Sequence, residues 1–97
     1  MRNLLHAARF ALGRIVMTSG VAELVASGVI ADPMHYVLRH ALGDWGDLCD
    51  EDKAVNQRAL RQGHQLISVY QIGPHTKVYV ITEGDRSVTT LLLPSEY

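Results

Sequence analysis

The C-terminal third of the chain, from residue 65 to residue 93, has the pattern of three consecutive β-strands. Its apolar, β-branched and aromatic runs cover 65–72, 77–82 and 88–93, and the loops GPHT and EGDRS separate them. Loops of this length are typical of hairpins, so the runs are predicted to pair as antiparallel strands. Apolar side chains alternate onto both faces. This indicates strands that are covered on both faces, or covered on one and paired with a partner on the other.

The first part of the chain has helical patterns around one candidate strand. Residues 4–12 predict a short helix, because their apolar side chains recur on one side. The β-branched run RIVMT at 14–18 predicts a strand, which would be the fourth of the sheet. A helix over 21–26 is expected next, with Thr18 or Ser19 as its N-cap.

Two further helices are predicted before the strands. Asp32 and Pro33 mark the start of one, with Asp32 as N-cap and Pro33 at the first helical position. The other is expected to run to about Gln62, capped by Asp47 or Asp50. Its acidic first turn and basic last turn suit the helix dipole. Its apolar face is thin, so we expect it at the periphery.

These elements predict an α+β domain, in which short N-terminal helices and one candidate strand precede a three- to four-stranded antiparallel sheet. The 97 residues are expected to form a single domain, 1–97, with residues 1–12 as a mobile or helical extension. Apolar residues make up 47% of the chain and charged residues 20%, which are ordinary globular values and argue against disorder. A domain of this size has modest stability, so a homodimer is a reasonable expectation.

Charge and cysteine content narrow the functional classes. The net charge is −1, with acids concentrated at 44–52, which argues against a protein that coats DNA. Cys49 is the single cysteine, so no intramolecular disulfide can form; we expect it to be a small buried apolar residue. No apolar stretch approaches the length of a membrane span. The sequence therefore predicts a cytoplasmic protein that contacts no membrane and uses no cofactor.

The turn between the last two predicted strands is the first candidate site. It presents Glu83, Asp85, Arg86 and Ser87 together, and the planar Arg86 fork could bind a phosphate. Polar residues also fill ordinary hairpin turns, and we favour that simpler interpretation. If the turn were catalytic, a metal-free ribonuclease would be the class to test. Such an enzyme needs an Arg, neighbouring hydroxyl groups and a nearby His at the edge of a sheet.

The acidic loop GDWGDLCDED is the second candidate site, with Asp44, Trp45 and Asp47 as its binding residues. A lone Trp in a loop is either an anchor folded onto the core or an exposed binding hot spot, and the anchor is favoured. No metal site is predicted. His35 and His40 are spaced five apart, about 140° around a helix, which suits one metal ion poorly.

The segments GRIVMTSG, RHALGDWGDLCDEDKAVNQRALRQG and VYVITEGDRSVTTLLLPSEY resemble a family of small uncharacterised proteins on plasmids and integrative elements of proteobacteria. Members carry labels such as "plasmid-related protein" or "type I restriction endonuclease subunit M". The resemblance spans residues 13–97, with Gly84 where the family has Ala. A methyltransferase is excluded by the short chain and by the lack of a Gly-rich cofactor loop. A weaker, fold-level likeness is to barnase/RelE-like ribonuclease toxins, and it implies Arg86, Thr89, His64 and Tyr70 as the residues to test.

The resemblance implies a small intracellular interaction protein of plasmids or integrative elements. It would bind a host protein or a nucleic acid, for example as an anti-restriction or anti-CRISPR accessory factor. We expect its surface to combine the acidic loop with the EGDRS turn. The alternatives are the ribonuclease-like enzyme and a DNA-binding accessory protein, and the latter predicts salt-dependent retention on duplex DNA.

Overall fold

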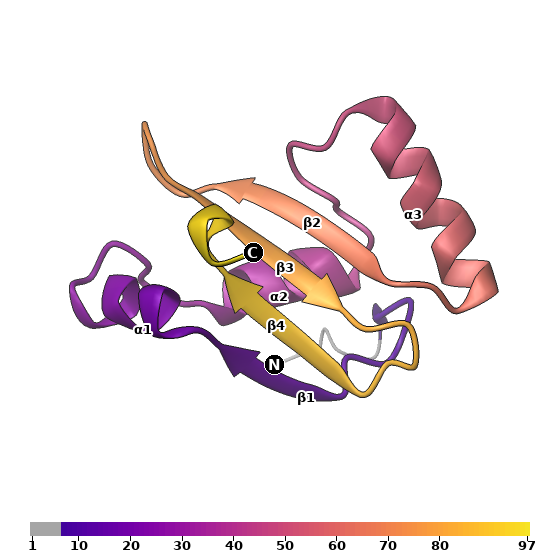
Figure 1. The fold of residues 1–97 in the computed structure, drawn as a ribbon, viewed down its shortest axis with the longest axis horizontal. Helices are drawn as coiled ribbons and strands as arrows, with labels where there is room; N and C mark the ends of the chain where they lie inside the picture. Colours follow the sequence, from indigo (N-terminus) through magenta and orange to yellow (C-terminus); the bar gives the residue numbers. More distant parts are fainter. Residues whose placement is uncertain (1–6) are drawn as a thin grey trace.

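The three C-terminal runs form the hairpins that their loops predict. In the computed structural model, which describes residues 7–97, they are β2, β3 and β4 of a four-stranded mixed sheet with the order β1-β4-β3-β2 (Figure 1). The fold is α+β. Its elements in chain order are β1 (Arg14–Met17), α1 (Ser19–Ala26), α2 (Met34–Ala41), α3 (Asp50–Gln62), β2 (Leu66–Gln71), β3 (Lys77–Thr82), β4 (Val88–Leu92) and the short 3₁₀ helix η2 (Pro94–Glu96).

The run at 14–18 does join the sheet, but its direction differs from the prediction. β1 pairs with β4 in parallel, with Arg14 opposite Val88 and Met17 opposite Leu91. The expectation of a purely antiparallel sheet is therefore wrong at this strand. A hairpin loop imposes antiparallel pairing on its two strands, whereas β1 and β4 are far apart in the chain and no turn sets their relative direction. β1 forms one edge of the sheet and β2 the other.

The first two helices begin close to where their caps predict. Thr18 is the N-cap of α1, and its hydroxyl accepts a hydrogen bond from the Val21 N–H at 3.4 Å. Asp32 accepts from the Met34 N–H at 3.0 Å, so it satisfies a free N–H at the start of α2. The regular helix begins at Met34, one residue later than predicted, so Pro33 rather than Asp32 occupies the N-cap position.

The predictions for the N-cap of α3, for the burial of Cys49 and for a helix before β1 are wrong. Cys49 occupies the N-cap position of α3 and makes no side-chain cap, and it is exposed rather than buried. Of the helix predicted over 4–12, residues 4–6 lie outside the described part, and residues 8–12 are not helical. Their backbone groups bond to other elements: the Arg9 N–H donates to the Ala41 carbonyl at 2.8 Å, and the Leu12 carbonyl accepts from the Thr89 hydroxyl.

One face of the sheet is fully covered, and the other, called the open face here, is covered only in part. α2 lies behind the sheet in Figure 1 and closes the main core, whose buried side chains include Val37, Tyr70, Val80 and Leu91. A second cluster joins α3 to β2 through Trp45, Ala59 and Leu66. The opposite face carries η2 and the C-terminal residue, with the rings of Tyr79 and Tyr97 5.7 Å apart. Within residues 7–97, no helix has the length and apolar character needed to cross a membrane.

Candidate functional site

The EGDRS turn directs its acids outward and its arginine inward. The backbone of Arg86 has a φ of 61°, in the left-handed region. Its guanidinium donates to the carbonyls of His64 at 2.7 Å, Glu83 at 3.1 Å and Ala59 at 3.1 Å, and so caps the C-terminal end of α3. Asp85 accepts from both the N–H and the hydroxyl of Ser87, which lowers the pKa of its carboxyl. The terminal nitrogens of Arg86 are therefore already engaged in holding the fold together.

Replacing Arg86 tests this structural role. Arg86→Ala is expected to lower the free energy of unfolding by about 2–3 kcal/mol, because it removes the charged donor to the carbonyls of Ala59 and His64 at the C-terminal end of α3. Arg86→Gly loses the same donor but tolerates the positive φ, so it should cost about 1 kcal/mol less than Arg86→Ala. Urea denaturation of the three proteins measures both differences. Equal stability of wild type and Arg86→Ala would contradict the capping role.

The residues proposed for a ribonuclease do not converge on an open site. Thr89 and Tyr70 are buried. The Thr89 hydroxyl bonds to the Leu12 carbonyl at 2.6 Å, and the Tyr70 hydroxyl donates to the Asp44 carbonyl at 2.5 Å. Burial raises the pKa of Tyr70, which makes it a poor base. His64 is exposed, and its contact with Arg86 is made by its backbone carbonyl.

A buried polar network surrounds His40, and it was not predicted from the sequence. The imidazole is fully buried, with Nδ1 2.5 Å from Ser68 Oγ and Nε2 2.9 Å from Thr82 Oγ1. Thr82 Oγ1 lies 2.7 Å from Thr89 Oγ1, and Thr89 donates to the Leu12 carbonyl. The network thus ties α2 to β2, β3 and β4, and to the segment before β1.

The end of this network fixes the tautomer of His40. A carbonyl can only accept, so the Thr89 hydroxyl donates to Leu12 and must accept from Thr82. Thr82 then accepts from the Nε2–H of His40, and Nδ1 is left to accept from Ser68. This neutral form leaves no hydrogen-bonding group of the network unsatisfied. Burial, followed by the charge of nearby Arg86, lowers the pKa of His40 to about 3.

The Trp45 loop closes the edge of the sheet at β2. Trp45 is 3% exposed and is an anchor, as favoured from the sequence. Its carbonyl accepts from the Val69 N–H at 3.2 Å, and the Asp47 N–H donates to the Val69 carbonyl at 2.7 Å. Asn56 of α3 continues the closure, because its side chain accepts from the Ile67 N–H at 3.3 Å and donates to the Ile67 carbonyl at 2.6 Å.

The acids around this loop remain exposed. Asp44 forms an ion pair with Arg39 at 2.6 Å, which lowers the pKa of its carboxyl. Asp47 is exposed, as are three acids of the first turn of α3, Asp50, Glu51 and Asp52. These acids lie at the N-terminal end of α3, whereas the EGDRS turn is held at its C-terminal end by Arg86. The two predicted binding segments therefore lie at opposite ends of one helix.

A groove runs between α3 and the open face of the sheet, beside these acids. Its volume is about 370 Å³. Apolar and aromatic side chains dominate its lining, with Asp52 among the polar ones; the set is Leu48, Asp52, Val55, Asn56, Gln65, Ile67, Val69, Tyr79 and Tyr97. Val55 is 51% exposed and Tyr97 73% exposed. The groove therefore combines apolar anchoring positions with one acid in its lining, Asp52, which shares the first turn of α3 with two further acids.

Comparison of the chain with protein-family models, with curated proteins and with solved structures found no match. Among residues 7–97, no group of three or more His, Cys, Asp and Glu side chains is arranged to hold a metal ion. His35 and His40 do not share a site, because His40 is enclosed by Ser68 and Thr82 and His35 packs beside Tyr36.

Proposed function

We propose that the protein acts by binding another protein, and that its partner presents a basic, partly apolar segment to the groove between α3 and the open face of the sheet. One observation carries the proposal: the groove joins exposed apolar positions to Asp52 in the acidic first turn of α3. Apolar side chains of the partner would fill the groove over Ile67, Val69 and Tyr79. Lys or Arg beside them would meet Asp52 and the neighbouring acids of the first turn of α3.

The charges favour a protein over a nucleic acid. Six of the seven residues predicted to bind from the sequence are acidic, neutral or anchored in the core, and the seventh, Arg86, donates to backbone carbonyls. A phosphate backbone needs several free Lys or Arg side chains on one surface. The exposed carboxylates of Glu83, Asp85 and Asp47 would repel it.

The ribonuclease alternative is disfavoured for a different reason. The hydroxyls of Thr89 and Tyr70 are already hydrogen-bonded inside the fold. If the resemblance to proteins of mobile elements holds, the partner would be a host protein, such as a component of restriction or CRISPR defence. An accessory factor of that kind can work by occupying a basic surface of its target, which suits an acidic groove.

A peptide probe tests the groove directly. A short synthetic peptide with Lys and Arg on either side of Leu and Ile is titrated into ¹⁵N-labelled protein, and backbone amide signals are followed. We expect the signals of Ile67, Val69 and Tyr79 to shift, with weaker binding as salt rises. An otherwise identical peptide with Glu and Asp in place of the basic residues should not bind, nor should duplex DNA or single-stranded RNA.

Val55→Lys places a positive charge in the groove and should weaken binding of the basic peptide at least about tenfold, which corresponds to about 1.4 kcal/mol. Val29→Lys is the matched control, because Val29 is also 51% exposed and lies outside the groove. An equal loss in both variants would mean that only the net charge matters and would reject the groove. Tighter binding of either nucleic acid than of the basic peptide would reject the proposal as a whole.

A further inference from the structure

The two edges of the sheet differ in how their backbone groups are satisfied. At β2, the outward N–H and C=O groups of Ile67 and Val69 bond to Asn56 and to the Trp45 loop. At β1, the N–H groups of Arg14 and Thr18 donate inward, to the carbonyls of Ser87 and Leu91, at 3.0 Å each. Successive residues of a strand direct these groups to opposite sides, so those of Ile15 and Met17 point outward.

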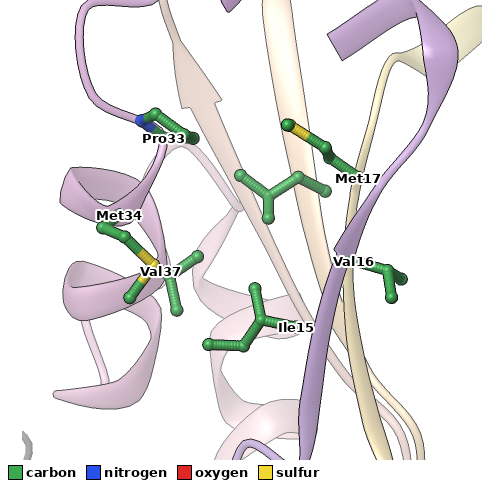
Figure 2. Close-up of a pocket in the computed structure, with 7 residues that line it drawn as sticks. Ile15, Val16, Met17, Pro33, Met34 and Val37 are labelled. Carbon is green, nitrogen blue, oxygen red and sulfur yellow. The ribbon is translucent and has the colours of Figure 1, made fainter. Parts of the chain in front are cut away.

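No hydrogen bond joins the outward groups of β1 to any other residue of 7–97. The side chains along this edge are also apolar and accessible, with Ile15 38% and Met17 46% exposed. Both point toward α2 and line a groove of about 200 Å³ with Pro33, Met34, Val37 and Leu91, whereas Val16 points away from it (Figure 2). An accessible edge with apolar side chains is a template for pairing with another strand.

We propose that the occupant is a second copy of this chain, paired antiparallel through β1 about a two-fold axis at Val16. In that register, Ile15 lies opposite Met17 of the second copy. Ile15 and Met17 are the residues whose backbone N–H and C=O groups point outward from the edge. An Ile15–Met17 pair across the two copies would exchange two N–H···O=C hydrogen bonds. The pairing closes the edge in both copies and joins their sheets into one.

The side chains are complementary in the same register. On the groove side, Ile15 of each copy meets Met17 of the other, which makes one apolar cluster from the two grooves. On the other side, Arg14 lies opposite Thr18 of the second copy. Thr18 donates to the Glu96 carboxylate at 2.5 Å, and the Gly20 N–H donates to it at 3.0 Å.

Glu96 is therefore held beside the position that Arg14 of the other copy would reach. Arg14 has no ion-pair partner within residues 7–97, so the dimer supplies one at each end of the paired strands. The two Arg14 residues themselves lie about 14 Å apart, from four residues at about 3.4 Å each, so like charges do not oppose each other. The two-fold register thus brings apolar groups against apolar groups and opposite charges together.

Cysteine cross-linking tests the register. In the cysteine-free background Cys49→Ser, Val16→Cys is oxidised and run on a non-reducing gel. The two Val16 Cα atoms would lie about 4.5 Å apart, within the range that a disulfide spans. Arg14→Cys is the matched control, because its Cα atoms are too far apart to be bridged. We expect a covalent dimer from Val16→Cys and none from Arg14→Cys.

Sedimentation equilibrium of the unmodified protein gives a second measurement that needs no new cysteine. We expect a monomer–dimer equilibrium that Arg14→Glu weakens about tenfold, since it sets a carboxylate against Glu96 at both ends. Arg58→Glu makes the same charge change on α3 and should leave the equilibrium unchanged. A wild-type protein that stays monomeric, or equal cross-linking at positions 14 and 16, would overturn the proposal. The peptide groove is separate, so Val55→Lys should dimerise normally whether or not the proposed function holds.

Discussion

Replacing Gly46 by alanine is expected to lower the free energy of unfolding by about 3–4 kcal/mol, combining backbone strain with a steric clash. Gly46 has a φ of 73°, which an L-residue adopts only at a cost. An added Cβ would also overlap the carbonyl oxygen of Val69, which accepts the hydrogen bond from Asp47. The chain would have to move away from β2, and the buried Trp45 would move with it.

Gly28→Ala is the matched control for this change. Gly28 has a φ of 83°, but an added Cβ would have no atom within 4 Å. It therefore isolates the cost of the positive φ, about 1 kcal/mol. Urea denaturation followed by Trp45 fluorescence gives both values on one scale. If Gly46→Ala cost no more than Gly28→Ala, the close approach of the loop to β2 would not be needed for stability.

The features that the sequence predicts well are those that depend on residues close together in the chain. The loops GPHT and EGDRS set the hairpins of β2, β3 and β4. The N-cap at Thr18 and the hydrogen bond from Met34 to Asp32 likewise depend on contacts within a few residues. The direction of β1 depends on pairing with a strand at the other end of the chain, which no local pattern encodes. Within the described part of the predicted 4–12 helix, helical periodicity is likewise overridden over residues 8–12, because residues 9 and 12 bond to α2 and β4.

The roles of single polar side chains were harder to predict, because their partners are distant. His40 bonds to Ser68 and Thr82, which lie 28 and 42 residues away. One signal was present: Ser68 alternates with Leu66 and Tyr70 on the buried side of a strand, so a polar group there needs a partner from elsewhere. Nothing in the sequence near Arg86 shows that its guanidinium reaches the end of α3.

The burial of His40 has a consequence for stability in mild acid. Its folded pKa of about 3 lies below the ordinary value of 6.5, because burial and then the Arg86 charge disfavour the protonated form. Below pH 6.5, His40 binds a proton in the unfolded chain, whereas in the folded protein it does not bind one until about pH 3. The unfolded state therefore binds more protons in this window, and stability falls as the pH falls through it.

The expected loss is about 2 kcal/mol between about pH 6.5 and about pH 5, and it comes from a single proton. Urea denaturation at about pH 7 and about pH 5 measures it. His40→Gln removes the titrating group, so the stability gap between wild type and His40→Gln should narrow by about 2 kcal/mol over this range. His64→Gln changes an exposed histidine and should keep the wild-type dependence.

Carboxylates do not produce the same effect in this window. The pKa of Asp44 is lowered by its bond to Arg39, and that of Glu96 by its bond to Thr18. A group with a lowered carboxyl pKa contributes stability that is lost only as the pH falls below its ordinary value, near 4. A constant gap between wild type and His40→Gln from about pH 7 to about pH 5 would therefore mean that His40 titrates normally in the folded protein. That result would contradict the sealed, neutral network that joins α2 to the sheet.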